Sequence, residues 1–101
     1  MKEITLAKID EIPTGSGKQF LVEGLPIAVF NVEGRFYAID DTCTHAEFSL
    51  SEGTLEGDVV TCPGHGAQFD LKSGDALTLP AVTGVRTYPV KIEGDLIKIV
   101  V

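Results

Sequence analysis

The chain has 101 residues, of which 44% are hydrophobic and 23% charged. This length suits one domain with one modest core, and the hydrophobic fraction is too high for a disordered chain. Fifteen acidic residues against eight basic ones give a net charge of −7. That charge argues against nucleic acid and anionic membrane surfaces as partners, because both repel an acidic protein.

The first residues, Met1 to Lys8, alternate charged and apolar side chains and contain no apolar stretch of the kind found in secretory signals. No run approaches the roughly 18 apolar residues that a membrane-spanning helix needs. We therefore expect a soluble, cytoplasmic protein with no membrane association, and we take a monomer as the default state.

Strand signals are frequent along the chain. Short apolar or alternating runs are separated by glycine, proline or acidic turn residues every eight to twelve residues, which is typical of a small sandwich or barrel. In the first run, Ile4, Leu6 and Lys8 are expected on one side of the strand, and Ala7 on the other. The predicted strands cover Lys2–Ile9, Gly17–Val22, Ile27–Val32, Arg35–Asp40, Val59–Cys62, Val85–Glu93 and Leu96–Val101. The dipeptides Glu33-Gly34 and Gly94-Asp95 are predicted as hairpin turns.

Helix signals are scarce, and one segment differs from the rest. Residues 41–72 contain both cysteines and both histidines but few alternating β-branched residues. This pattern predicts an all-β protein in which a loop-rich insert, 41–72, is carried on an antiparallel base formed by residues 1–40 and 73–101.

The insert contains two short motifs, Cys43-Thr44-His45 and Cys62-Pro63-Gly64-His65, with sixteen residues between His45 and Cys62. These motifs hold every cysteine and histidine of the chain, arranged as two pairs of metal-binding side chains. Pro63 restricts the second loop, whereas Gly64 and Gly66 allow close backbone approach and positive φ. The residues alone leave three other interpretations open: buried structural side chains, a Cys/His nucleophile, or a structural zinc site.

The two motifs resemble the ligand loops of Rieske-type ferredoxins, in particular the small ferredoxins of bacterial ring-hydroxylating dioxygenase systems. The resemblance extends to residues 49–53, to Phe69-Asp70 and to Ser73-Gly74, and covers about residues 25–101. It implies one [2Fe–2S] cluster, with one iron bound by Cys43 and Cys62 and the other, nearer the surface, by His45 and His65. It also implies a small antiparallel sandwich or barrel that carries a cluster-binding subdomain, here residues 41–72.

The resemblance further implies an electron carrier and not an enzyme, with a flavin-containing NAD(P)H reductase as donor and a terminal oxygenase as acceptor. A chain of this length has no room for the catalytic iron domain of an oxygenase. A carrier for another oxygenase or reductase system, a zinc module, and a relative that has lost its cluster remain alternatives. Three acidic residues of the insert, Glu47, Glu52 and Glu56, are candidates for orienting the partners.

Residues around the proposed ligands predict the redox potential. Two histidines in place of two thiolates make the site less negative and raise the potential above that of all-cysteine sites. Respiratory Rieske proteins have Ser and Tyr where Ala67 and Phe69 stand here, and their hydroxyls donate to sulfur. They also carry a disulfide between the loops, at positions that we align with Leu50 or a neighbour and with Gly64. Without these features we expect a potential near −150 mV. Ala46, Pro63, Gly64, Gly66, Ala67 and Phe69 are the expected surroundings of the cluster.

Overall fold

A computed structural model of the chain describes residues 2–43, 48–64, 66–78 and 83–101. Its described part is all-β, with two single turns of 3-10 helix at Ile9–Glu11 and Leu50–Glu52. The strands are β1 (Glu3–Lys8), β2 (Gly17–Val22), β3 (Leu25–Val32), β4 (Arg35–Asp40), β5 (Thr54–Glu56), β6 (Val59–Thr61), β7 (Gln68–Asp70), β8 (Thr87–Tyr88), β9 (Val90–Glu93) and β10 (Leu96–Val100).

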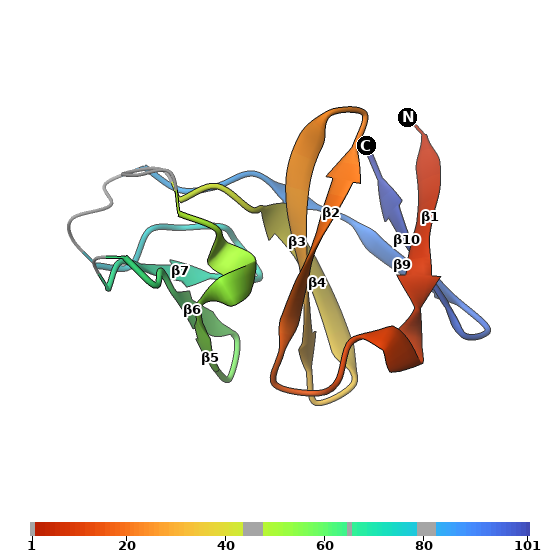
Figure 1. The fold of residues 1–101 in the computed structure, drawn as a ribbon, viewed down its shortest axis with the longest axis horizontal. Helices are drawn as coiled ribbons and strands as arrows, with labels where there is room; N and C mark the ends of the chain where they lie inside the picture. Colours follow the sequence, from red (N-terminus) through yellow and green to blue (C-terminus); the bar gives the residue numbers. More distant parts are fainter. Residues whose placement is uncertain (1, 44–47, 65, 79–82) are drawn as a thin grey trace.

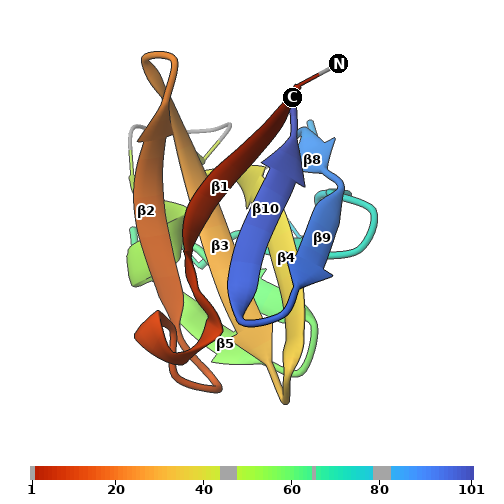
Figure 2. The same cartoon turned by 90° about the vertical axis from the view of Figure 1, so that its right-hand side faces the viewer.

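These strands form three antiparallel sheets, with the orders β1-β10-β9, β2-β3-β4-β8 and β5-β6-β7. The sheets follow one another along the longest axis of the molecule, and β2-β3-β4 lies in the middle (Figure 1). Viewed from the side of the termini, β1, β10 and β9 cover one face of the central sheet (Figure 2). The predicted antiparallel sandwich is therefore confirmed.

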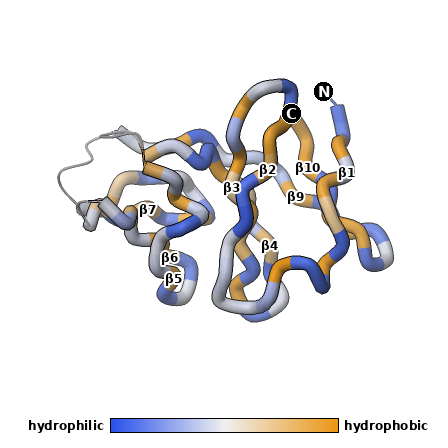
Figure 3. The backbone as a smooth tube through the Cα atoms, in the orientation of Figure 1, coloured by the Kyte–Doolittle hydropathy of each residue, from blue (hydrophilic) through white to orange (hydrophobic). Residues whose placement is uncertain are grey.

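The central sheet is apolar on both faces because β3 and β4 each contribute side chains to two separate cores. On β3, Ile27 and Val29 face the sheet of β1, while Ala28 and Phe30 face the sheet of β5–β7. This two-sided burial explains why β3 has an uninterrupted apolar run from Ile27 to Phe30; Figure 3 shows the chain coloured by hydropathy.

We name the two cores by their places. The base core lies between the first two sheets and consists of Ile12, Val22, Ile27, Val29, Ala38, Tyr88, Ile97 and Ile99. The site core lies between the central and third sheets and consists of Ala28, Phe30, Ile39, Cys43, Leu50, Val60, Cys62, Ala67, Phe69, Leu71 and Val85.

The hairpin predicted at Glu33-Gly34 is confirmed. Both residues have positive φ, 51° at Glu33 and 88° at Gly34, and they join β3 to β4 in register from Val32 opposite Arg35. Two positive φ values in a two-residue turn match the twist of the flanking strands. The turn at Gly94-Asp95 likewise joins β9 to β10.

Two strand predictions need correction. In β1 the register shifts between Thr5 and Ala7, so Ala7 is buried and Lys8 is exposed, opposite to the alternation that we expected. The single strand expected over Val85–Glu93 is divided at Pro89, which lacks a backbone N–H, into β8 on the central sheet and β9 on the sheet of β1 and β10.

Candidate metal centre

The first predicted ligand loop leaves the end of β4 and is closed at its base by main-chain hydrogen bonds. The Asp41 N–H donates to the carbonyl oxygen of Pro26, and the Leu50 N–H donates to that of Asp41, at N···O distances of 3.0 and 2.6 Å. One step further, the Cys43 N–H donates to the Phe48 carbonyl oxygen at 3.0 Å. Thr42 and Ser49 also form an isolated antiparallel bridge. Cys43 is therefore held just inside the closed end of the loop.

The second predicted ligand loop is the tip of the β6–β7 hairpin. The Cys62 N–H donates to the Ala67 carbonyl oxygen at 2.7 Å, and the Gly66 N–H donates back to the Cys62 carbonyl oxygen at 3.3 Å. Gly66 has a φ of 77°, so the positive φ expected there is present. Cys62 thus occupies the same place in its hairpin as Cys43 does in the first loop.

The fold places the two cysteines in the same core. Both side chains are about 2% exposed and both belong to the site core, although they lie nineteen positions apart in the sequence. They form no disulfide. Thiolate is the form of cysteine that binds metal, and two buried cysteines that enter one core from two separate loops suit an iron site.

The histidine part of the prediction lies outside the described residues, as do Ala46 and Glu47. Within residues 2–43, 48–64, 66–78 and 83–101, no group of three or more Cys, His, Asp and Glu side chains is placed to hold a metal ion. The assignment of His45 and His65 as ligands therefore stays a prediction, as does the complete set of four.

The residues expected around the cluster fall into two groups. Ala67 and Phe69 are fully buried in the site core, whereas Pro63, Gly64 and Gly66 are exposed at the tip of the second loop. Neither Ala67 nor Phe69 carries a group that could donate a hydrogen bond to sulfur. The geometry is thus compatible with the expected surroundings, with the donors of respiratory Rieske proteins lacking at these two positions.

An aromatic contact between the two loops was not foreseen. A β-carbon built on Gly64 would lie 2.9 Å from Cζ of Phe48 and closer still to two other ring carbons. Only glycine therefore lets the Phe48 ring pack against the second loop at this point. The residue that faces Gly64 is Phe48 and not Leu50, which is fully buried in the site core.

A second feature that sequence reasoning missed is Asp41, a carboxylate only 2% exposed and two residues before Cys43. Its side-chain oxygens accept hydrogen bonds from the Gln19 amide at 2.6 Å, the Ser51 N–H at 2.8 Å and the Ser49 hydroxyl. In the sequence, Asp41 stands next to Asp40 at the end of a strand, where acidic residues usually mark a solvated turn.

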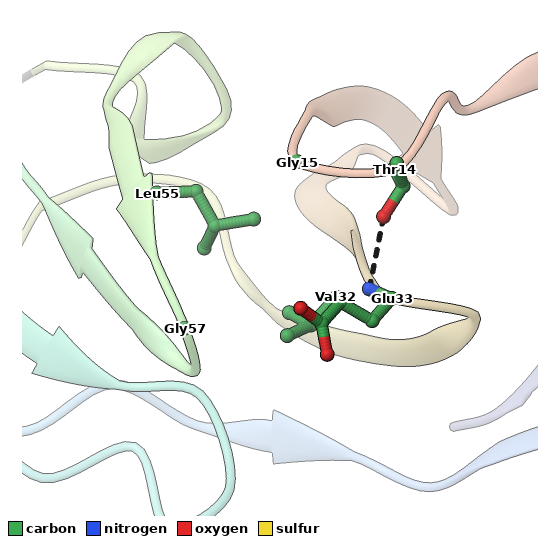
Figure 4. A pocket seen from close by; sticks show the side chains of 6 residues that line it. All are labelled: Thr14, Gly15, Val32, Glu33, Leu55 and Gly57. Atoms are coloured by element: carbon green, nitrogen blue, oxygen red, sulfur yellow. Dashed lines mark hydrogen bonds between the residues drawn. The ribbon is translucent and has the colours of Figure 1, made fainter.

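The cavity shown in Figure 4 lies apart from the cysteines. It has a volume of about 310 Å³ and separates Leu55 of β5 and Gly57 of the β5–β6 turn from Thr14, Gly15, Val32 and Glu33 of the base. The Glu33 N–H donates to Thr14 Oγ1 at 3.0 Å on the base side. This hollow therefore marks the boundary between the base and the third sheet, and it is not a substrate pocket around the cysteines.

Comparison with known proteins identifies the family. Residues 2–89 match the family described as the Rieske [2Fe-2S] domain. The chain belongs to this family, and the predicted cofactor, a Rieske-type [2Fe–2S] cluster, is confirmed by that match. No helix in the described part of the chain is both long enough and apolar enough to cross a membrane.

Similar proteins are ferredoxins of dioxygenase systems. The chain is 43% identical over 98 residues to the ferredoxin component of the naphthalene 1,2-dioxygenase system of Pseudomonas aeruginosa, covering 97% of this chain and 94% of that protein. The ferredoxin of carbazole 1,9a-dioxygenase from Nocardioides aromaticivorans IC177 has 31% identity and a TM-score of 0.93, covering 98% and 97% of the two chains. A chain in a complex of reduced oxygenase and oxidized ferredoxin of carbazole 1,9a-dioxygenase has 33% identity and a TM-score of 0.91, covering 96% and 91%. The resemblance inferred from the motifs is confirmed.

Proposed function

We propose that this protein carries single electrons from a flavin-containing NAD(P)H reductase to the terminal oxygenase of a system that hydroxylates aromatic rings. The observation that carries the proposal is similarity along almost the whole chain to ferredoxin components of such systems. In this role the protein is not itself an enzyme, and the aromatic substrate is bound by the oxygenase. We place it in the cytoplasm as a monomer.

We assign the cluster to Cys43, His45, Cys62 and His65. The thiols of Cys43 and Cys62, buried in one core, fit one half of a Rieske donor set, and the two motifs supply one histidine each for the other half. When bound, the cluster supplies a site that takes up and releases one electron. We assign residues 41–72 as the cluster-binding subdomain on a base of residues 1–40 and 73–101.

The chain's own residues would exclude water from one side of this site and leave the other side accessible to a partner protein. Leu50, Val60 and Phe69 share the buried site core with the two cysteines, and this core excludes water. Phe48, 40% exposed, and Leu77, 48% exposed, leave apolar surface on the loops next to the two hairpin ends. A buried centre near an exposed apolar surface suits electron transfer over a short distance to a docked protein.

The oxygenase is the partner for which a related complex is known, since the carbazole system includes a structure of its ferredoxin with its oxygenase. Glu52 and Glu56 are exposed on the third sheet and its approach, so they are available to orient a basic partner surface. Electron-transfer rates should then fall as ionic strength rises. Rates that do not change with salt would argue against electrostatic docking.

Ala67 and Phe69 give a redox prediction. The double substitution Ala67→Ser with Phe69→Tyr introduces two hydroxyls that can donate to sulfur and stabilise the reduced state. We expect the midpoint potential, near −150 mV in the parent protein, to shift in the positive direction. Protein-film voltammetry measures it, and an unmoved midpoint in a variant with an intact cluster would refute the hydrogen-bond explanation.

The function is tested by mixing chemically reduced protein with the oxidised oxygenase of a naphthalene-type system under anaerobic conditions and following the visible absorbance of both. We expect one electron to be delivered per molecule, and none from Cys62→Ser, which lacks a ligand. The same spectra separate the zinc alternative, because a zinc protein is colourless. Protein that contains iron and sulfide but transfers no electron to any such oxygenase would point to a different electron-transfer system.

A further inference from the structure

Asp41 is the buried charged side chain, among the described residues, that the proposed function leaves unexplained. An ionised carboxylate that is 2% exposed is costly unless its oxygens are bonded. Here each oxygen has a partner, with Ser51 N–H on Oδ1 and Gln19 and Ser49 on Oδ2. Every one of these groups can donate, so the network suits the charged form.

The Asp41 network joins the base to the first ligand loop. Gln19 belongs to β2 of the central sheet, whereas Ser49 and Ser51 lie where the loop returns towards the third sheet. The Asp41 main chain adds two bonds, from its N–H to Pro26 and from the Leu50 N–H to its carbonyl oxygen. Asp41 thus forms hydrogen bonds that connect both ends of the loop that contains Cys43.

Asp41 is also close to Cys43 and faces the same way. Two residues of extended chain span about 7 Å, which limits the separation of their Cα atoms. Asp41 and Cys43 are both buried while Thr42 between them is exposed, so both side chains point into the protein. Both side chains are about 2% exposed, so bulk water screens the Asp41 carboxylate only weakly from Cys43.

We propose that Asp41 is a positioning residue for the iron site and, as a fixed buried negative charge beside Cys43, holds the redox potential low. Uptake of one electron adds one negative charge, and a nearby anion in a poorly screened environment opposes that change. This effect acts in addition to the lack of hydroxyl donors at Ala67 and Phe69. The inference rests on the proposed function, because it needs a cluster bound by Cys43.

The decisive variant is Asp41→Asn, which removes the charge and keeps the shape. Its oxygen can still accept from Ser51, its NH2 group can donate to the Ser49 hydroxyl, and the Gln19 amide can turn to match it. Glu52→Gln is the matched control, since it removes one charge from the adjacent helical turn at an exposed position. We expect a positive shift of the midpoint potential in Asp41→Asn that is several times the shift in Glu52→Gln. The Asp41→Asn shift should persist in high salt, whereas the control shift should vanish.

A second variant keeps the test valid if Asp41→Asn does not fold. Ser49→Ala removes one donor from the carboxylate and leaves its charge less compensated, so the midpoint should move in the negative direction. A purely structural role for Asp41 does not predict midpoint shifts of opposite sign in Asp41→Asn and Ser49→Ala. Midpoints in Asp41→Asn that equal the Glu52→Gln value, or a Ser49→Ala shift that is zero or positive, would overturn the proposal. Iron and acid-labile sulfide are measured first in each protein, because their absence from the parent protein refutes the proposed function instead.

Discussion

The two faces of the central sheet differ in how their cores are completed. Most side chains of the base core come from β2, β3, β4 and β10, which are strands of five to eight residues. The site core is covered on one side by three strands of three residues each, β5, β6 and β7, and two of its members are cysteines. Short strands with few pairings form a weak sheet, so we infer that the site core depends on its cofactor, while the base core does not.

Removal of the cluster should therefore give the largest difference in stability between the two regions. After chelation of iron under reducing conditions, we expect amide protection to be lost in β5, β6 and β7 and retained in β3 and β10. Hydrogen exchange read by mass spectrometry or NMR measures this, with the iron-loaded protein as control. Equal loss of protection in both regions would mean that the sandwich folds as one unit with the metal centre.

Truncation of one large side chain in each core sharpens the comparison. Phe69 and Ile97 are both fully buried. The free energy of unfolding should fall by about 3–5 kcal/mol in Phe69→Ala and by about 2–5 kcal/mol in Ile97→Ala. Phe69→Ala should also lose iron, whereas folded Ile97→Ala should keep it. Denaturant titration and iron content measure the two effects, and iron loss of the same size in both variants would contradict the separation.

The contact between the two loops gives a smaller effect. Gly64→Ala should lower the free energy of unfolding by about 1–3 kcal/mol, because the new methyl group collides with the Phe48 ring. Phe48→Ala removes the obstacle, so Gly64→Ala should cost much less in that background. The rate of iron release to a chelator, measured for both single variants and the double variant, gives the coupling. Additive effects would show that the ring does not hold the second loop.

The smallest expected effect concerns the base alone. Burial and the hydrogen bond to Asp40 at 2.6 Å raise the pKa of Tyr88 above its ordinary value of 10.0. The neutral phenol is thus favoured in the folded state, and its contribution to stability is complete below about pH 10 and is lost as the pH rises towards the folded pKa. Tyr88→Phe should cost about 1 kcal/mol at neutral pH and flatten the alkaline decline. Urea titrations from pH 7 to 11 check this, and an unchanged alkaline slope would exclude Tyr88 as its source.

Much of the fold followed from the sequence because strong alternation and turn dipeptides mark long strands. Gly17–Val22 and Arg35–Asp40 were predicted with the bounds that the structure has. The strands β5 and β7 were missed, since three residues are too few to establish a period of two. The bulge in β1 was also invisible, because a register shift arises from pairing with β10 and not from local sequence.

The candidate site was predictable where residue chemistry is rare and unpredictable where it is common. Two cysteines and two histidines in paired motifs indicated a metal centre, and the structure brings Cys43 and Cys62 into one core. Asp41 and Phe48 carried no such signal, because the sequence does not show that one is buried and the other packs against Gly64. Their roles depend on contacts between segments that only the folded chain brings together.

The most direct test of the central claim is pulsed electron paramagnetic resonance on dithionite-reduced protein in which only the histidines carry ¹⁵N. A cluster bound by His45 and His65 predicts strong hyperfine couplings from two nitrogens that change from the ¹⁴N to the ¹⁵N pattern on labelling. A reduced iron–sulfur signal with no strongly coupled nitrogen would contradict the assignment of these two histidines as ligands.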